Sequence, residues 1–535
     1  MAWMRMFTLL LVYFIGLALA VDKNNFKSCD QSSFCRRLRG VKPDDSKYEI
    51  DLDSLQALDN AVEAKLINTE AGAEFKLSLT ALAGNIFRLQ VDEVNPLHPR
   101  YRPQYALNGE PQVAKLEVLD RNKESIVVQS GDNKAAIYFK PLKVEFFKND
   151  VLVSVVNGRG LFTFEHYRTK APENVGEGEV EQPKEDPGAW EENFKAHHDS
   201  KPRGPSAVGL DVTFPGALRA YGLPEHADRL ALRTTAPGGL DPYRLYNLDV
   251  FEYEVDSTMA IYGAVPVVYA HSLKHTVGVF WHNAAETWVD INNSKDGNVM
   301  SSLVNLVSGT KTENSVEAHF MSESGIIDLF VLMGPKPKDA VKQYALLTGV
   351  APLPQYFTLA YHQCRWNYVD EDDVTTVVES FDSNDLPVDV MWLDIEYTDG
   401  KKYFTWDPLK FRHPDVMINN LTATGRKLVV IIDPHIKRES GYFLHEDALA
   451  NDYYVKNKDG SVYEGASSYL DFYDPKVVDY YKGLYSTDKF KGTSNDVFIW
   501  GEERQEPSVF NGPEVTMPKD CLHYGGWEHR DVHNE

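Results

Sequence analysis

The sequence predicts two regions of different fold class, a β-sandwich that extends to about residue 350 and parallel βα units after it. Two observations support this prediction. Before residue 350, many short segments alternate apolar and polar residues at regular spacing, which is typical of antiparallel strands packed in a sandwich. After it, segments that are apolar almost throughout are separated by stretches of helix length, which is typical of buried parallel strands.

The predicted strands of the first region fall on both sides of an irregular stretch. They are residues 75–82, 86–91, 143–147, 207–212, 265–270 and 276–281. The stretch between the two groups, residues 171–206, is rich in Pro, Gly, Glu and Lys and has no apolar period. Such a composition is typical of a solvated connection. We therefore predict a sandwich over residues 21–350 that carries an exposed linker at 171–206.

The second predicted region, residues 351–535, contains four strands. They are residues 357–363, 388–395, 427–435 and 497–500, with a helix predicted at 371–381. A closed barrel of eight βα units needs about 250 residues, and the chain offers about 180 after Leu353. An open doubly wound sheet could be built from four or five strands. No Gly-rich phosphate turn follows the first strand, so nucleotide binding has no support.

Charge and the first residues limit the partners of the protein. A formal net charge of −24 provides no basic surface for nucleic acid. Residues 1–20 combine a single positive charge, an apolar run and a small-residue ending, Ala18-Leu19-Ala20, which predicts a cleaved signal peptide. The apolar run is short for a membrane span, so we expect no stable span. The mature protein is therefore predicted to enter the secretory pathway.

The cysteines and sequons fit an oxidising compartment. Cys29 and Cys35 are six residues apart and lie just after the predicted cleavage site, so a small disulfide loop is expected. Their spacing and the lack of nearby histidines do not match a zinc ligand set. Asn292 and Asn420 begin sequons and are glycosylation candidates if they are exposed. No metal and no cofactor are predicted.

Each predicted parallel strand ends in acidic or aromatic residues. In chain order these are Trp366, then Asp394 and Glu396, then Asp433, His435 and Ile436, and finally Trp500, Glu502, Glu503 and Glu506. The carboxyl ends of the parallel strands in a barrel meet at one rim, where active sites lie. Taken singly, an Asp at a strand end is about as often a turn or helix cap as a ligand. Trp366 or Trp500 alone is more often packed in the core than a platform for a sugar. The spacing of Asp433 and His435 alone does not make a metal site.

Carboxylates next to tryptophan suit the cleavage of sugar bonds. One carboxylate must be ionised to attack or stabilise an oxocarbenium-like centre, while another must hold a proton for the leaving oxygen. Asp394, Glu396 and the glutamates of residues 502–506 supply acids, and an indole can stack on the apolar face of a pyranose. These residues predict a glycoside hydrolase.

Motifs along nearly the whole mature chain resemble glycoside hydrolase family 31. The most specific are Asn25–Cys29, Tyr243–Tyr253, Tyr361–Tyr368, Trp392–Tyr397, Asp433–Ile436, Glu506–Glu514 and His523–Asn534. The resemblance implies a galactose-mutarotase-like β-sandwich followed by a (β/α)8 TIM barrel, with about four of the eight strands present. It also implies a retaining α-glucosidase of the endoplasmic reticulum lumen that trims α-1,3-linked glucose from N-glycans with the help of a β subunit.

The resemblance assigns residues to the substrate pocket. It implies that Asp249 reaches into the pocket from the sandwich. Trp366, Asp394, Ile436 and Trp500 would line the subsite that holds the glucose to be cleaved. It also makes the Cys29–Cys35 segment one of the matching motifs.

The departures from the family pattern concern catalysis. The family nucleophile is the Asp of W-[N/I]-D-M-N-E-P, whereas this chain reads Trp500-Gly-Glu-Glu-Arg-Gln-Glu-Pro507. Counting back from Glu506-Pro507 assigns the nucleophile position to Glu503, and counting forward from Trp500 assigns it to Glu502. The family's W-C-W-P-G segment is replaced within Tyr463–Tyr469.

The general acid of the family lies beyond Glu535, so it is expected to be absent from this chain. We therefore expect a C-terminally truncated member that is inactive by itself. The alternative is a non-catalytic relative that binds glycans or a subunit.

Overall fold

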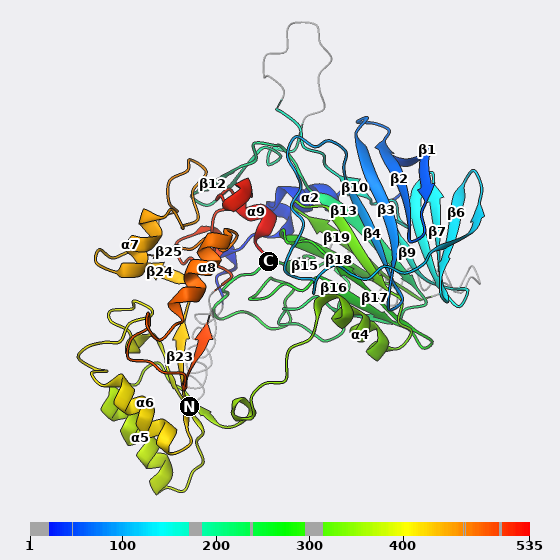
Figure 1. Cartoon of the computed structure of the whole chain (residues 1–535). Coiled ribbons are helices and arrows are strands. Elements are labelled where there is room, and N and C mark those ends of the chain that lie inside the picture. Colours follow the sequence, from blue (N-terminus) through cyan, green and yellow to red (C-terminus); the bar gives the residue numbers. More distant parts are fainter. Residues whose placement is uncertain are drawn as a thin grey trace, which may run out of the picture. The chain divides into compact units, whose positions relative to one another are not determined.

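The computed structural model describes residues 21–44, 46–170, 185–235, 239–294, 314–463, 465, 467–501 and 505–535 (Figure 1). The chain divides into two compact units. The first unit comprises Met1–Val350, Gly512–Lys519 and Arg530–Glu535, and the second comprises Ala351–Asn511 and Asp520–His529. The predicted signal peptide lies outside the described residues. Among those described, no helix is long and apolar enough to cross a membrane.

The first unit is built on two large antiparallel sheets (Figure 1). The eight-stranded sheet runs, in spatial order, β1 (Tyr48–Ala57), β2 (Ala61–Asn68), β3 (Glu74–Leu82), β4 (Ile86–Glu93), β20 (Ile327–Leu332), β17 (Thr276–Trp281), β16 (Val267–His271) and β14 (Arg219–Gly222). The ten-stranded sheet runs β15 (Tyr243–Leu245), β18 (Thr287–Asn293), β19 (Ser315–Ser322), β13 (Val208–Pro215), β9 (Val151–Val156), β8 (Leu142–Lys148), β7 (Asn133–Phe139), β6 (Ser125–Ser130) and β5 (Glu117–Arg121), with β10 (Thr163–Phe164) paired to β13.

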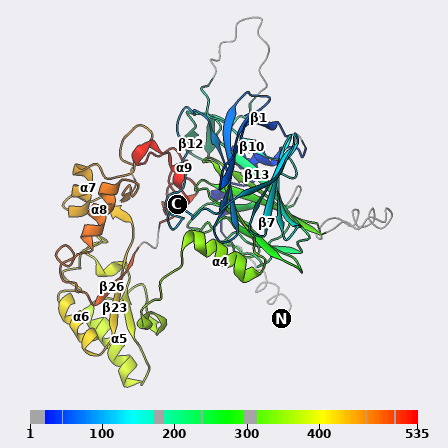
Figure 2. The same ribbon diagram turned by 45° about the vertical axis from the view of Figure 1, so that its right-hand side comes forward.

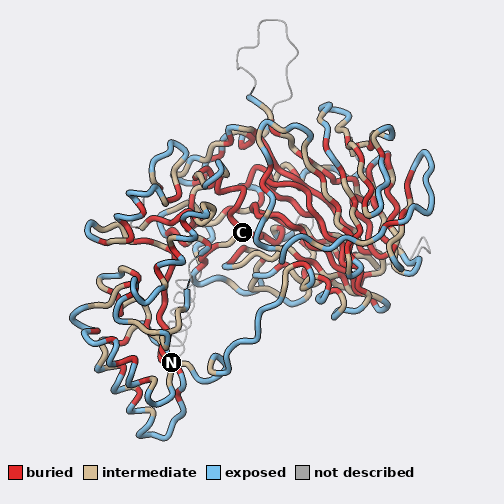
Figure 3. The backbone as a smooth tube through the Cα atoms, in the orientation of Figure 1, coloured by how far each residue is buried: buried red, intermediate tan, exposed pale blue. Residues whose placement is uncertain are grey.

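One hydrophobic core joins the two sheets. Its buried side chains come from strands of both, and the rings of Phe87 on β4 and Phe146 on β8 lie 5.4 Å apart. On β3 the alternation is plain, because Phe75 is fully buried while Lys76 is exposed. Figure 3 shows the buried residues concentrated along these strands. The predicted β-sandwich is therefore present, with one face of each sheet directed to the core.

Short helices complete the first unit. They are η1 (Lys23–Asn25), η2 (Cys29–Gln31), α2 (Ser33–Arg39), α4 (Pro337–Thr348) and η5 (Pro513–Val515). The structure joins Cys29 and Cys35 in a disulfide that ties η2 to α2. Arginines of α2 pair with acids of the sandwich, for example Arg39 with Asp290 at 2.9 Å.

The prediction of an exposed linker at 171–206 is wrong for the part that the structure describes. Residues 185–206 include a hairpin of β11 (Glu191–Phe194) and β12 (His197–Ser200). Phe194 and Glu192 both face inward and are buried. The stretch lacks an apolar period because one inward position holds a glutamate, whose charge is neutralised by Lys201 at 2.9 Å and Lys27 at 3.2 Å.

A network of buried ion pairs holds the two late segments, Gly512–Lys519 and Arg530–Glu535, in the first unit. Lys519 binds both Glu286 and Glu323, and all three side chains are at most 7% exposed. Glu514 binds Arg244 at 2.6 Å, and Arg244 also binds Glu286 at 2.8 Å. A further pair links Arg530 to Asp199 of β12 at 2.7 Å. A buried charge is tolerated only when it is paired, so these segments are required by the sandwich.

The second unit contains a four-stranded parallel sheet, in the order β21 (His362–Gln363), β22 (Val390–Leu393), β23 (Lys427–Ile432) and β26 (Val497–Gly501). Its helices are η3 (Tyr356–Leu359), α5 (Glu371–Ser383), η4 (Ile395–Tyr397), α6 (Pro414–Ala423), α7 (Phe443–Ala450), α8 (Pro475–Leu484) and η6 (Tyr524–Gly526). The helix α9 (His529–Val532) begins at His529, the last residue of the second unit, and continues into the first unit. Helices α5 and α6 lie side by side (Figure 1, Figure 2). A second pair of strands, β24 (His435–Lys437) and β25 (Ser467–Tyr469), is antiparallel.

Helix α5 shows how the sequence sets these elements. Its N-cap, Asp370, accepts a hydrogen bond from the backbone N–H of Asp373 at 2.8 Å. Three acids occupy the first turn, where they interact favourably with the helix dipole. Val374 and Val378 are one turn apart and both are buried, so a single apolar stripe faces the core.

Two strand predictions need correction. Over 357–363, residues up to Leu359 form the 3-10 turn η3, and the backbone pairs as a strand only at His362 and Gln363. Strand β26 is half-buried rather than buried, and Trp500 is 53% exposed. The reason is that β26 pairs with β23 on one side and, among the described strands, forms an edge of this sheet.

We expect Lys519→Met to destabilise the first unit by about 3–5 kcal/mol, because it leaves Glu286 and Glu323 buried with too little positive charge. Differential scanning calorimetry should show the transition of the first unit at a lower temperature. The matched control is Lys76→Met, which removes an exposed partner of Glu63 and should change little. Equal effects of the two variants would contradict the role given to the network.

The same network predicts acid sensitivity. Burial raises the pKa of Glu192, but Lys27, Lys201 and Lys519 outweigh it and lower this pKa to about 2 from an ordinary 4.5. A lowered pKa in the folded state means that the stabilisation is complete above about pH 4.5 and is lost as the pH falls toward 2. The unfolding temperature should fall across this window, and less steeply in Glu192→Gln. An unfolding temperature that stays the same from pH 5 to pH 2 would rule out this role of Glu192.

Candidate active site

A cavity of about 610 Å³ opens in the second unit, next to the carboxyl ends of β22 and β23. It is lined by Trp366, Asp394, Ile395, Lys401, Ile431, Asp433, His435, Gly465, Ser467, Tyr469, Ser508, Val509, Phe510 and Asn511. Strands β22 and β23 contribute Asp394 and Asp433, because the residue that follows the last paired position of each parallel strand emerges at the same edge of the sheet. The cavity is large enough for a sugar unit and carries both carboxylates and aromatic rings.

Asp394 reaches the cavity from the end of β22. It caps the short helix η4, and its Oδ1 accepts a hydrogen bond from the backbone N–H of Ile395 at 2.6 Å. The turn of η4 is anchored to β23, because the hydroxyl of the buried Tyr397 donates to the carbonyl oxygen of Ile431 at 2.9 Å. The carboxylate of Asp394 is thus held by a rigid turn and is only half-buried.

Asp433 is the second carboxylate of the cavity and follows β23. Its residue is 6% exposed, and its Oδ2 accepts a hydrogen bond from the hydroxyl of Tyr403 at 2.7 Å. Its Oδ1 has no hydrogen-bond partner among the described residues. Burial and then the charge of Asp433 raise the pKa of Tyr403 far above its ordinary value, so the phenol remains a donor at any physiological pH.

A second wall of the cavity comes from the strand pair β24–β25 and from the segment after β26. His435 is paired with Tyr469 across the two strands. The hydroxyl of Tyr469 donates to the carbonyl oxygen of Ser508, which fixes the segment 508–511 against this wall. Gly465, Ser467 and Tyr469 all lie in the stretch Tyr463–Tyr469, where the chain departs from the W-C-W-P-G pattern.

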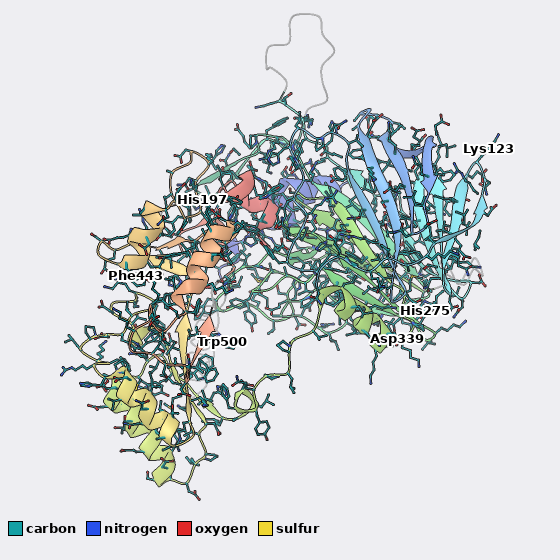
Figure 4. The ribbon with its side chains drawn as sticks, viewed as in Figure 1. Lys123, His197, His275, Asp339, Phe443 and Trp500 are labelled. Atoms are coloured by element: carbon teal, nitrogen blue, oxygen red, sulfur yellow. A yellow bond between two sulfur atoms is a disulfide. The ribbon has the colours of Figure 1, made fainter. Side chains whose placement is uncertain are left out.

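Aromatic side chains follow the strand ends. Trp366 is 71% exposed at the cavity, and its Nε1 donates to Oε1 of Glu396 at 3.3 Å. The Nε1 of Trp392 donates to Nδ1 of His362 at 2.8 Å, and the rings of Trp392 and Trp500 lie 5.4 Å apart. Figure 4 shows Trp500 near the end of β26.

The residues predicted for the site are found in different places. Trp366 and Asp394 line the same cavity. Ile436 adjoins it through His435 but is itself in the core, at 1% exposure, and Trp500 contacts Trp392 without lining the cavity. Asp249 is a buried residue of the first unit. Glu502 and Glu503 lie outside the described residues.

Asp433 was noted at a strand end in the sequence but was not assigned to the glucose subsite, and the structure places it in the cavity. Lys401 and Tyr469, which also line the cavity, were not singled out from the sequence. Lys401 and Tyr469 had no comparable signal, since they come from a loop and from an irregular stretch. In the part of the chain that the structure describes, no cluster of three or more His, Cys, Asp or Glu side chains is arranged to hold a metal ion.

The two sequon asparagines differ in their surroundings. Asn420 is exposed on α6, whereas Met417 and Leu421 of the same helix are buried. Asn292 is half-buried on β18, and its side-chain amide donates to Oε2 of Glu317 at 3.0 Å.

Comparison with protein families finds two matches along the chain. Residues 76–290 match the glycosyl hydrolase 31 N-terminal galactose mutarotase-like domain, and residues 351–535 match the glycosyl hydrolases family 31 TIM-barrel domain. The two matches correspond to the sandwich and to the parallel-stranded unit. The fold is therefore a galactose-mutarotase-like β-sandwich with TIM-barrel βα units after it.

Individual relatives agree with these matches. The chain is 44% identical over 563 residues to neutral alpha-glucosidase AB of Mus musculus, with 100% of this chain and 59% of the relative covered. It is 41% identical to a glucosidase II alpha subunit solved with Glc1Man2 bound, at a TM-score of 0.87, covering 95% of this chain and 57% of that one. The catalytic subunit in a solved ER glucosidase II heterodimeric complex with the binding domain of the regulatory subunit matches at 41% identity and a TM-score of 0.86, covering 95% and 58%.

The chain thus spans somewhat more than half the length of these relatives. Two domain matches in the same order, and similarity along its own whole length, show that the chain belongs to glycoside hydrolase family 31.

Proposed function

We propose that the cavity of the second unit binds the terminal glucose of an α-glucoside and that the protein acts as a retaining α-glucosidase. The observation that carries the proposal is the meeting of two carboxylates, Asp394 and Asp433, with the exposed indole of Trp366 in one cavity at the carboxyl ends of parallel strands. Carboxylates can accept hydrogen bonds from several sugar hydroxyls, and the apolar face of a pyranose can stack on the indole. Membership of the family supports the same reaction class.

In a retaining mechanism, one carboxylate attacks the anomeric carbon and a second carboxyl group protonates the leaving oxygen. We place the nucleophile at Glu503, with Glu502 as second choice, because these residues follow β26. No residue among the 535 is assigned as the general acid. Asp394, Trp366, Ile436 and Trp500 are proposed to form the glucose subsite, and Asp249 is proposed to contribute to it from the sandwich.

The names of the relatives support a narrower proposal. One solved relative is described with Glc1Man2 bound, and another as part of an ER heterodimer with a regulatory subunit. We infer that the substrate is α-1,3-linked glucose on N-glycans, that the compartment is the endoplasmic reticulum lumen, and that a glucosidase II β subunit is the partner. The acidic composition of the chain gives no support for nucleic acid as a partner.

A specific observation favours a second candidate function. The nucleophile position holds glutamate, which is one methylene longer than the expected aspartate, in a stretch with one extra residue. A displacement of about 1 Å can cost about 10²-fold in rate. A non-catalytic relative that binds glycans or a subunit would tolerate this change.

Asp394→Asn should weaken the binding of glucosyl-α-1,3-mannose by about 10- to 100-fold, because a hydrogen bond to a charged group is lost. Isothermal titration calorimetry measures this directly. Asp415→Asn, an exposed aspartate on α6, is the matched control and should bind like the unmodified chain. The galactosyl epimer should bind poorly to all three. Unchanged affinity in Asp394→Asn would refute the assignment of the cavity.

We expect a polypeptide of these 535 residues to release no glucose from 4-nitrophenyl α-glucoside above the uncatalysed background, because the nucleophile position is altered and no general acid is assigned. Turnover that depends on Glu503 would contradict this. If the longest polypeptide expressed from the gene also binds the disaccharide without turnover, the non-catalytic function is the correct one.

The sequons provide a test of the proposed compartment. Asn420 should carry an N-glycan, because it is exposed, whereas Asn292 should not, because its amide is engaged by Glu317 within the sheet. In protein purified from eukaryotic cells, Asn420→Gln should lower the mass by one glycan, and Asn292→Gln should leave the glycan mass unchanged. An unglycosylated wild-type chain would contradict entry into the secretory pathway.

A further inference from the structure

We propose that Glu396 is a positioning residue that fixes the indole of Trp366 at the mouth of the cavity, with Lys401 as its counterion. The proposal rests on the proposed function of the cavity as a glucoside site. It concerns three residues that converge from different segments: Trp366 follows β21, Glu396 lies on η4 and Lys401 lies on the loop after η4. Both Trp366 and Lys401 line the cavity.

The first step of the argument is that Trp366 has little else to hold it. At 71% exposure its ring gains almost nothing from packing in the core. Within the described part of the chain, its indole N–H is held by one hydrogen bond, to Oε1 of Glu396 at 3.3 Å. A side chain that is free to change rotamer must lose that freedom when a ligand stacks on it, and this loss reduces affinity. A fixed ring avoids the loss.

Glu396 itself stands on a rigid base. It lies in the middle of η4, between the capping residue Asp394 and Tyr397, whose ring is fully buried and whose hydroxyl is bonded to the backbone of β23. The hydroxyl of Thr398 closes the same turn by donating to the carbonyl oxygen of Ile395 at 2.7 Å. The turn that carries Glu396 is attached to the sheet at both ends, because Asp394 directly follows β22 and Tyr397 is hydrogen-bonded to β23. Glu396 therefore fixes the indole relative to the sheet.

Lys401 completes the arrangement. Its Nζ lies 3.5 Å from Oε1 of Glu396 and 5.9 Å from the centre of the Trp366 ring. Its loop is tied down by neighbouring lysines: Lys437 donates to the carbonyl oxygen of Gly400 at 2.8 Å, and Lys402 pairs with Asp399 at 2.9 Å. The backbone of Lys401 has a φ of 65°, in the left-handed region that residues other than glycine rarely adopt.

A contribution to stability does not explain this arrangement. Lys401 is 54% exposed and Glu396 is 26% exposed, and ion pairs in contact with water contribute little to folding. The arrangement instead places an anion, a cation and an aromatic ring next to one another at the cavity. We infer that it prepares the ring to receive a sugar before the sugar arrives.

The test is a set of variants measured by titration of glucosyl-α-1,3-mannose. Glu396→Ala should weaken binding about five- to tenfold, because the ring must then be ordered by the ligand. Glu396→Gln keeps an acceptor for the indole N–H and should lose less than about threefold. The matched control is Glu379→Ala, an exposed glutamate on α5, which should change nothing. The unfolding temperature should be the same in all of them.

Coupling to Trp366 separates positioning from a direct contact of Glu396 with the sugar. In a Trp366→Ala background, Glu396→Ala should cause no further loss, since there is no ring left to position. An additional loss of the same size would overturn the proposal, and so would wild-type affinity in Glu396→Ala.

A second measurement does not depend on the ligand. The chain has nine tryptophans, and labelling them with 5-fluorotryptophan gives each a ¹⁹F resonance, of which Trp366→Phe identifies one. Without ligand, Glu396→Ala should move and sharpen this resonance, because the ring becomes free to rotate, while Glu396→Gln should leave it in place. An unchanged resonance overturns the proposal even if the disaccharide fails to bind. If the disaccharide fails to bind although the ¹⁹F resonance changes as expected, only the proposed function is refuted.

Discussion

The pairing of Lys519 with Glu286 and Glu323 is the interaction on which the first unit depends most. The three charges are buried, and each would be costly to bury alone. The lysine comes from a segment 196 residues further along the chain than Glu323. A sandwich that buries two glutamates in this way is incomplete until the later segment arrives. This explains why a region that ends near residue 350 by its strand pattern includes Gly512–Lys519 and Arg530–Glu535 as well.

A different constraint governs the second unit. Parallel strands point the same way, so the residues that follow β22 and β23 emerge together and bring Asp394 and Asp433 into one cavity. The buried tyrosines Tyr397 and Tyr403 hold that edge from below by hydrogen bonds to the backbone and to a carboxylate. The direction of the strands therefore determines which carboxylates reach the cavity. The hydrogen bonds of Tyr397 and Tyr403 hold the residues around them in place.

Family membership and the local sequence give different information about catalysis. The two domain matches and the similarity to alpha-glucosidases set the reaction class that we propose. The stretch after Trp500 departs from the family pattern at the nucleophile, and the wall at Tyr463–Tyr469 departs as well. Trp366, Asp394 and Asp433 belong to neither departure, whereas Gly465, Ser467 and Tyr469 of the same cavity lie in the altered wall. The proposed binding of a glucoside is therefore tested separately from the proposed turnover.

The sequence by itself determined the order of the two folds, several strands in each region, and the strand ends that carry Trp366, Asp394 and Asp433, because local periodicity and chain direction are properties of short segments. It also pointed to the small loop of Cys29 and Cys35. It could not give the hairpin β11–β12, whose inward-facing Glu192 is acceptable only beside Lys27 and Lys201, nor the edge position that leaves Trp500 exposed. It could not place Lys401, on the loop after η4, or Tyr469, on β25, at the cavity. Partners distant in the chain decide whether a charge can be buried and where a loop residue lies, and only the tertiary structure supplies those partners.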